Sequence, residues 1–282
     1  FFQEVGELIE QLTLWSSREF EGRNDDRAVY ELPDEIGVFK LLQLLCLGNF
    51  APCQNCIRDQ FGNTRVVGLI GQLATYSDVL SRLESHLCTQ MCIHLVQTIH
   101  TLIQGPCKGN QDQFVLQTEL LLSLNRIIRD IKPQFGCSIE WYYHIERLKE
   151  CSVDVLRASI EDQPPNSVIL ERVATSIELG VLHVLILPKD SSSDRLIDRE
   201  DMEMTPLQAK YLVFRHSLRE QTKLSGFSLP VQTVYQSGIS CVEVVWNNEV
   251  HRHYFHIPDI ANDLSAMSID MLYAAMDSPT HE

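Results

Sequence analysis

The sequence is short of basic residues and has no long apolar run. Its 23 lysines and arginines face 38 acidic residues, which leaves a formal charge of −15. A surface of this sign repels a phosphate backbone, so a nucleic-acid partner is not expected. The longest apolar stretch, 181–187, falls far below the roughly 20 residues that a membrane helix requires. We therefore expect a globular segment with no membrane span of its own.

Motifs of common enzyme sites are also missing. The sequence has no glycine-rich phosphate loop, no GxSxG elbow and no HExxH pair. Neither catalysis nor a bound cofactor is therefore expected. The chain starts at Phe1 without a signal-peptide pattern, which indicates a piece of a longer protein. Nine cysteines scattered through helical patterns do not form a secreted disulfide framework and favour a reducing, cytosolic setting.

Cysteine spacing raises the question of a metal site. Cys53 and Cys56 have the CxxC spacing of a zinc or redox pair, and Cys88 lies one helical turn from Cys92. The two pairs form a four-sulfur site only if the fold brings them together. Ordinary buried cysteines are the preferred interpretation.

Histidines and acids near the C-terminus are weighed in the same way. His251, His253 and His256 fall in one predicted strand, but zinc needs further donors of matching geometry. An exposed hairpin face is the preferred interpretation. The acidic tract 190–203 lacks the central glycine of a calcium loop and is interpreted as a solvated linker. No metal site is expected.

Apolar residues recur at helical spacing through the first two-thirds of the chain. The longest stripe, Leu80 to Leu102, advances in steps of three and four and predicts one helix of about six turns, ended by Gly105 and Pro106. Residues 16–26 read as a loop. The other helices are predicted over 1–15, 33–46, 65–76, 114–129, 139–160, 167–187 and 207–224.

The helix at 33–46 is apolar nearly all round, which predicts burial on several sides. We expect the following residues in the core: Leu42, Leu45, Leu87, Met91, Leu95, Ile99, Leu121, Leu124 and Leu156.

After residue 230 the period changes to that of strands. Ser240–Trp246 and Val250–His256 are predicted as a hairpin joined by polar residues, and 260–276 as a last helix. The fold class is mainly α: an armadillo-like helical stack followed by a small α+β hairpin appendix. The expected division is an N-terminal helix and loop, a helical domain, an acidic linker and a hairpin segment, over 1–32, 33–187, 188–206 and 207–282.

Two blocks of sequence are specific. FKLLQLLC at 39–46 is followed by QNCIRDQ at 54–60 and GNT at 62–64. The second block consists of Gln104, Gly105, Pro106, Cys107, Lys108, Gly109, Asn110 and Gln111. Together they resemble the RIH-associated domain of intracellular calcium-release channels, the inositol trisphosphate and ryanodine receptors. The likeness is weaker beyond residue 111, where 210–224 and the two strands are similar to segments that precede these channels' first membrane span.

The resemblance implies a tetrameric calcium channel of the endoplasmic reticulum, with this segment on the cytosolic face between ligand-sensing domains and pore. Its partners would be other domains and subunits of that channel. Family members offer two glutamates to an activating calcium ion, where this sequence has Leu47 and Thr101. Because leucine supplies no oxygen ligand, we expect this calcium site to be lost. Glu84 and Glu119 are the alternatives if the register differs.

The leading hypothesis is therefore a coupling region that relays ligand-induced movement to the pore. In this hypothesis, Gly105 and Pro106 shape a turn between stacked helices. The alternative is a soluble helical-repeat scaffold that binds other proteins and has no pore. The two hypotheses predict the same fold and differ in whether apolar spans follow Glu282 in the gene.

Overall fold

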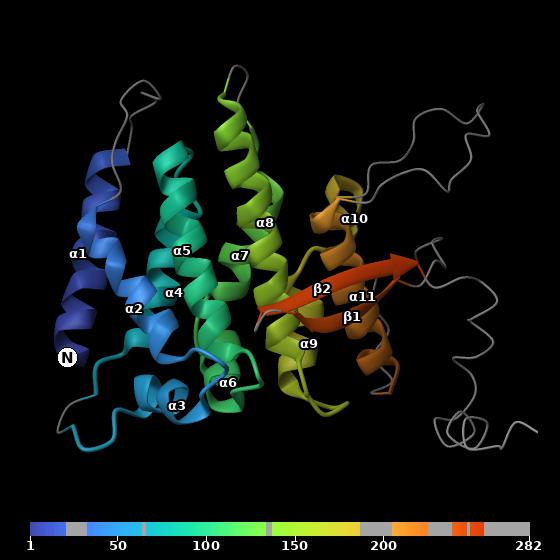
Figure 1. The fold of residues 1–282 in the computed structure, drawn as a ribbon, viewed down its shortest axis with the longest axis horizontal. Coiled ribbons are helices and arrows are strands. Elements are labelled where there is room, and N and C mark those ends of the chain that lie inside the picture. The colour runs from blue at the N-terminus through green and yellow to red at the C-terminus, as the bar shows by residue number, and fades with distance from the viewer. Residues whose placement is uncertain are drawn as a thin grey trace, which may run out of the picture. The chain divides into compact units, whose positions relative to one another are not determined.

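The structure is a computed structural model with two compact units, 1–231 and 232–282, which are described separately. It describes residues 1–20, 33–63, 66–133, 137–186, 205–224, 239–246 and 249–256. The fold is mainly helical, as the sequence predicts (Figure 1). None of the described helices combines the length and the apolar character needed to cross a bilayer.

Helices of the first unit follow one another with short connections. They are α1 (Phe2–Phe20), the 3-10 turn η1 (Asp34–Ile36), α2 (Gly37–Leu45), α3 (Ala51–Asp59), α4 (Leu69–Leu80), α5 (His86–Ile103), α6 (Lys108–Leu116), α7 (Leu120–Asp130), α8 (Ile139–Ile160), α9 (Val168–Ser176), α10 (Leu179–Ile186) and α11 (Pro206–Leu224).

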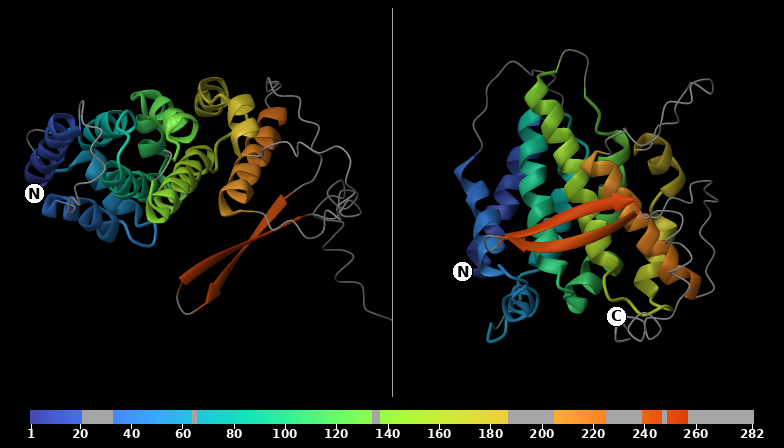
Figure 2. Two further views of the ribbon diagram at one scale, coloured as in Figure 1. Left: turned by 90° about the horizontal axis from the view of Figure 1, so that it is seen from above. Right: turned by 45° about the vertical axis from the view of Figure 1, so that its right-hand side comes forward.

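Long helices of this unit pack side by side in a row. Helix α1 packs on α4, α4 on α5, α5 on α8 and α8 on α11 (Figures 1 and 2). Helix α5 also contacts α2 and α6, so its apolar side chains are enclosed on more than one face. The expected stripe of Met91, Leu95 and Ile99 is completely buried there.

Capping residues explain the element boundaries that agree with the sequence. Helix α8 spans Ile139–Ile160 as predicted, and the Ser138 hydroxyl accepts a hydrogen bond from the Trp141 amide at its start. Both Asn166 and Ser167 are possible caps from the sequence, and in the structure the Ser167 hydroxyl accepts from the Ile169 amide at the start of α9. A serine in this position satisfies one amide that the first turn leaves unpaired.

Three predicted helices contain a break in the structure, although the first of them is almost entirely α5, with only Leu80 on α4. The stripe from Leu80 to Leu102 is interrupted at 81–85, because the Ser85 hydroxyl caps a new helix by accepting from the Cys88 amide at 3.1 Å. The helix predicted at 114–129 is broken at 117–119, and that at 167–187 is broken at 177–178. Hydrophobic spacing continues across these breaks and therefore conceals them.

Two further boundaries were wrong. Residues 51–59, where no helix was expected, form α3, with a proline in its first turn. Helix α1 continues to Phe20 through part of the expected loop. Its Ser16 is buried, and the hydroxyl shares a hydrogen bond of 3.0 Å with the Tyr76 hydroxyl of α4. This contact between distant residues extends the helix, and local sequence gives no sign of it.

The expected core is correct at eight of its nine positions. The buried ones are Leu42, Leu87, Met91, Leu95, Ile99, Leu121, Leu124 and Leu156. Leu45 is 37% exposed and its neighbour Leu44 is 55% exposed. The prediction that α2 is buried on several sides was therefore wrong. Helix α2 packs on α5 and α1 through Val38, Phe39 and Leu42, and the described residues supply no cover for its other face.

The second unit contains two strands. Strands β1 (Ile239–Trp246) and β2 (Glu249–His256) pair antiparallel with Val245 opposite Val250. Their bounds lie within one residue of the predicted strands. The helix predicted at 260–276 and the acidic tract 190–203 lie outside the described residues. The α+β appendix as a whole and the four-part domain division therefore stay predictions.

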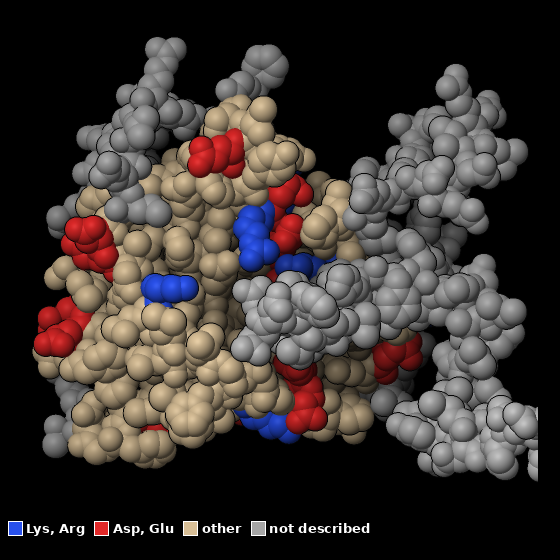
Figure 3. Space-filling model, viewed as in Figure 1, with Lys and Arg blue, Asp and Glu red and all other residues tan. Residues whose placement is uncertain are grey.

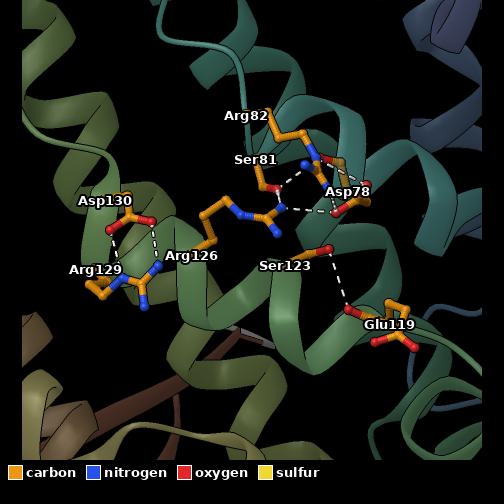
Figure 4. Close-up of polar contacts among 8 residues, drawn as sticks. All are labelled: Asp78, Ser81, Arg82, Glu119, Ser123, Arg126, Arg129 and Asp130. Atoms are coloured by element: carbon orange, nitrogen blue, oxygen red, sulfur yellow. Dashed lines mark hydrogen bonds and ion pairs between the residues drawn. The ribbon is translucent and has the colours of Figure 1, made fainter.

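An ion-pair network joins α4 to α7 (Figure 4). The Asp78 carboxylate accepts from Arg82, which lies four residues on and just past the end of α4, and from Arg126 of α7 at 2.9 Å. Arg126 also donates to the Ser81 hydroxyl at 2.7 Å. Although burial by itself disfavours the charged carboxylate, hydrogen bonds from Arg82 and Arg126 hold the pKa of Asp78 below its usual value.

We expect Asp78→Asn to lower the free energy of unfolding by about 1 kcal/mol at neutral pH, since the group is partly exposed. The folded-state pKa of Asp78 is depressed. Its contribution is therefore complete above the unfolded pKa and is lost as the pH falls through the folded pKa. The difference between parent and variant in urea unfolding should shrink below about pH 4. Exposed Asp112, changed to Asn, is the control; a difference constant with pH would contradict the assignment.

Candidate functional site

The block 104–111 forms the turn from α5 to α6 and the first turn of α6. Gln104 and Pro106 are half-buried, Gly105 is exposed with φ of +91°, and Cys107 is buried immediately before α6. Inside α6, Gly109 is half-buried, while Asn110 and Gln111 are completely buried. Two adjacent buried amides in an otherwise apolar interior each need hydrogen-bond partners.

Asn110 is satisfied at both ends of its side chain. Its Nδ2 donates to the Leu102 carbonyl of α5 at 2.8 Å and to the Gln54 carbonyl of α3 at 3.1 Å. Its Oδ1 accepts from Arg58 of α3 at 3.0 Å. Arg58 is itself held by two hydrogen bonds to the neighbouring Asp59 carboxylate. One amide thus ties α6 to both α3 and α5.

Gln54 completes the end of α5. This side chain from α3 is 1% exposed, and its Nε2 donates to the carbonyls of Thr101 at 2.8 Å and Gln104 at 3.0 Å. These carbonyls lie at the end of a helix, where no further turn is present to donate to them. The glutamine supplies the missing donor.

Gln111 has the same role at the end of α8. Its Nε2 donates to the Ala158 carbonyl at 2.6 Å and to the Glu161 carbonyl at 3.3 Å, and its Oε1 accepts from Gln163 at 2.8 Å. We call the side chains of Gln54, Asn110 and Gln111 with these partners the amide junction. It joins α3, α5, α6 and α8 at one end of the first unit.

Both glycines of the block leave room for close approach. A Cβ at Gly109 would clash with an Arg58 nitrogen, in the space that the guanidinium occupies beside Asn110. A Cβ at Gly105 would lie 2.5 Å from the Asn49 Cβ. Glycine is therefore needed at 105 for both its positive φ and its contact.

At the two positions where family members have calcium-binding glutamates, this chain has residues that supply few oxygen ligands. Leu47 is 73% exposed. The Thr101 hydroxyl donates to the Gln97 carbonyl, and its own carbonyl accepts from Gln54. Glu84 lies in the 81–85 connection, and Glu119 precedes α7, where its main-chain carbonyl accepts from Ser123 (Figure 4). Neither glutamate belongs to a group of three or more ligating side chains in the described part of the chain.

The two candidate cysteine pairs do not come together into one site. Cys53 and Cys56 lie on α3, whereas Cys88 and Cys92 are buried in α5, and the described residues contain no cysteine cluster suited to a metal. Burial raises the pKa of Cys88 to about 12. The thiol therefore stays protonated near neutral pH, unlike the thiolate that zinc binds. The side chains of the three hairpin histidines lie outside the described part.

Sequence analysis did not identify one cluster of three side chains that could bind a metal ion. His86, Glu140 and His144 offer nitrogen and oxygen atoms that all lie within 4.8 Å of one another. The spacing of Glu140 and His144, one helical turn apart, was a readable signal. His86 is more than fifty positions away in the chain, and only the packing of α5 against α8 brings it there.

The first unit is a helical domain in which buried side-chain amides bind the ends of α5 and α8. Residues 35–128 match the model of a protein family described as RyR and IP3R Homology associated, RIH_assoc. The match covers about a third of the chain and confirms the resemblance read from the sequence. The domain points to the inositol trisphosphate and ryanodine receptor type of channel. No curated protein matches the chain.

Gly105→Ala should destabilise the chain by about 2–4 kcal/mol, because the residue must keep a positive φ and its Cβ meets Asn49. Gly48→Ala is the matched control. Gly48 also has a positive φ, of +71°, but a Cβ there meets nothing within 4 Å, so we expect a cost of about 1 kcal/mol. Urea unfolding of both variants measures the difference; equal losses would refute the close contact.

Calcium titration tests the loss of the family's ion site. With Leu47 and a hydrogen-bonded Thr101 at its two positions, the chain should show no saturable binding in the micromolar range of sensor sites. Calorimetric titration with calcium chloride measures this. Saturable micromolar binding that Glu84→Gln or Glu119→Gln abolishes would place the site at those alternatives instead.

Proposed function

We propose that this chain is the cytosolic coupling region of an inositol trisphosphate receptor-like calcium-release channel. In that role it passes ligand-induced movement to the pore at the cytosolic face of the endoplasmic reticulum. Its work is mechanical, without catalysis. The observation that carries the proposal is the amide junction, in which family-block residues Asn110 and Gln111 bind the ends of α5 and α8.

A relay needs helices that move as units. Helix ends held by fully paired buried amides resist sliding, because a shift would leave donors and carbonyls unpaired in the interior. We therefore propose that the row of helices is an armadillo-like stack in which α3, α5, α6 and α8 shift together. Packed helices of this kind transmit a displacement along the row.

The link continues from α8 to α11 through a charge cluster. Lys210 of α11 donates to Asp154 of α8 at 2.6 Å and lies 3.5 Å from Glu150. All three side chains are mostly buried, so solvent screens these pairs little. The Tyr211 hydroxyl adds a hydrogen bond to the Leu179 carbonyl at 2.8 Å. In the proposal, α11 carries the movement towards the segment that follows it in sequence.

The family suggests that the chain is part of a larger channel assembly, and we propose other domains and subunits of a tetramer as its partners. The outward side of α2 and the following turn expose large apolar side chains, namely Leu41, Leu44, Leu45, Leu47 and Phe50. The face seen in Figure 3 carries few charged side chains over α2 and α5. A neighbouring domain of the assembly would bury such a surface.

The same exposed surface is the observation that favours the alternative, a soluble helical scaffold that binds proteins and lacks a pore. Both functions use it for docking. They differ in membrane association of the natural protein. Fractionation with the endoplasmic reticulum membranes supports the channel, and fractionation with the soluble proteins supports the scaffold.

Gln111→Ala in the full-length protein tests the relay. It removes the donor to the Ala158 carbonyl and should uncouple the helices without touching a ligand site. We expect inositol trisphosphate binding to membrane vesicles to be retained and calcium release to fall roughly tenfold, within the usual range of coupling energies. Asp112→Ala, at the exposed next position on α6, is the matched control and should release calcium normally.

A folding check separates uncoupling from misfolding. Gln111→Ala must be present in the vesicles at the parent's level and retain ligand binding for its release to be compared. Undiminished calcium release by a folded Gln111→Ala protein would refute the relay through the amide junction.

A further inference from the structure

His86, Glu140 and His144 meet where the start of α5 packs on α8. His86 is the first residue of α5, and Glu140 and His144 lie one turn apart on α8. Both imidazoles are half-buried and the carboxylate is exposed. The Trp141 ring is 6.3 Å from the His86 ring, and its Nε1 donates to the Thr89 hydroxyl at 3.0 Å. The backbone positions of the three ligating groups are therefore set by packed helices.

The two imidazoles are in direct contact. The His86 Nε2 and the His144 Nδ1 are 2.7 Å apart, a hydrogen-bond distance. One ring must donate and the other accept, so at least one of them is neutral. A metal ion binds the neutral form of imidazole.

Geometry fits a tetrahedral ion after a small adjustment. Two nitrogens bound to zinc at about 2.0 Å lie about 3.3 Å apart at a tetrahedral angle, slightly farther than the 2.7 Å observed between His86 and His144. Small side-chain rotations of half-exposed rings supply this separation. The exposed carboxylate of Glu140 is already within 4.8 Å of both nitrogens.

We propose that His86, Glu140 and His144 bind a divalent transition-metal ion of the zinc type, with water at the fourth position. Two imidazoles and one carboxylate suit zinc and its neighbours, whereas calcium and magnesium require more oxygen ligands. The ion joins the beginning of α5 to α8, away from the amide junction at their other ends. Because both helices present N-terminal ends to the cation, we expect a moderate, micromolar affinity.

Calorimetric titration of the metal-stripped 282-residue chain with zinc chloride tests the site. A Cys53→Ser, Cys56→Ser background removes the CxxC pair as a competing ligand. We expect one saturable ion per chain, no competition from excess magnesium or calcium, and a rise in Tm of about 5 °C at hundredfold excess over Kd. Cobalt chloride, followed by its visible absorption, should report a four-coordinate nitrogen and oxygen environment.

Variants assign the ligands. His144→Asn and Glu140→Gln should each weaken zinc binding about tenfold or more, because each removes one of three protein ligands. Glu140 is exposed, so its variant folds whatever the cost at His144, and circular dichroism checks this. His94→Asn, farther along α5, is the matched control and should bind as the parent does.

Two outcomes overturn the proposal. One is the absence of saturable zinc binding by the stripped chain. The other is binding that Glu140→Gln and His144→Asn leave unchanged, which would place the ion on another surface.

Discussion

The first unit depends on one constraint: the carbonyl groups at the ends of its buried helices must find hydrogen-bond donors. The last carbonyls of a helix have no partner within it, and an unpaired carbonyl in an apolar interior is costly. Here the ends of α5 and α8 meet, and the amides of Gln54, Asn110 and Gln111 donate to them. Because each amide serves two carbonyls, the position of one helix end determines that of its neighbours.

The proposed mechanical role of the family block rests on this constraint. Within this block the buried Asn110 and Gln111 contribute hydrogen-bond donors and acceptors, and the exposed Gly105 contributes a turn with positive φ. The helices joined in this way continue through Lys210 to α11. A metal ion on His86, Glu140 and His144 would act on the same helix pair from its opposite end, so that α5 and α8 would be fastened twice.

Local sequence patterns predicted some residues of the candidate site and missed others. Block 104–111 was identified from the sequence, since it is contiguous, whereas Leu47 and Thr101 as former calcium-ligand positions stay predictions from the resemblance. The partners of the block were not, because Gln163 and the carbonyl of Ala158 lie some fifty positions away. His86 was missed for the same reason. Cysteine spacing left a four-sulfur site open beside the preferred interpretation of ordinary buried cysteines, and the burial of Cys88 and Cys92 within α5 does not support that site.

The sequence by itself determined the helical class, most core positions and the starts of α8 and α9 to within a residue or two, because periodicity and capping are local properties. Tertiary structure alone decided where the long apolar stripes break and that Leu44 and Leu45 lie outside the core. It also decided which carbonyls the buried amides meet. These outcomes depend on which helix occupies the neighbouring space, and residues far apart in the chain supply that helix.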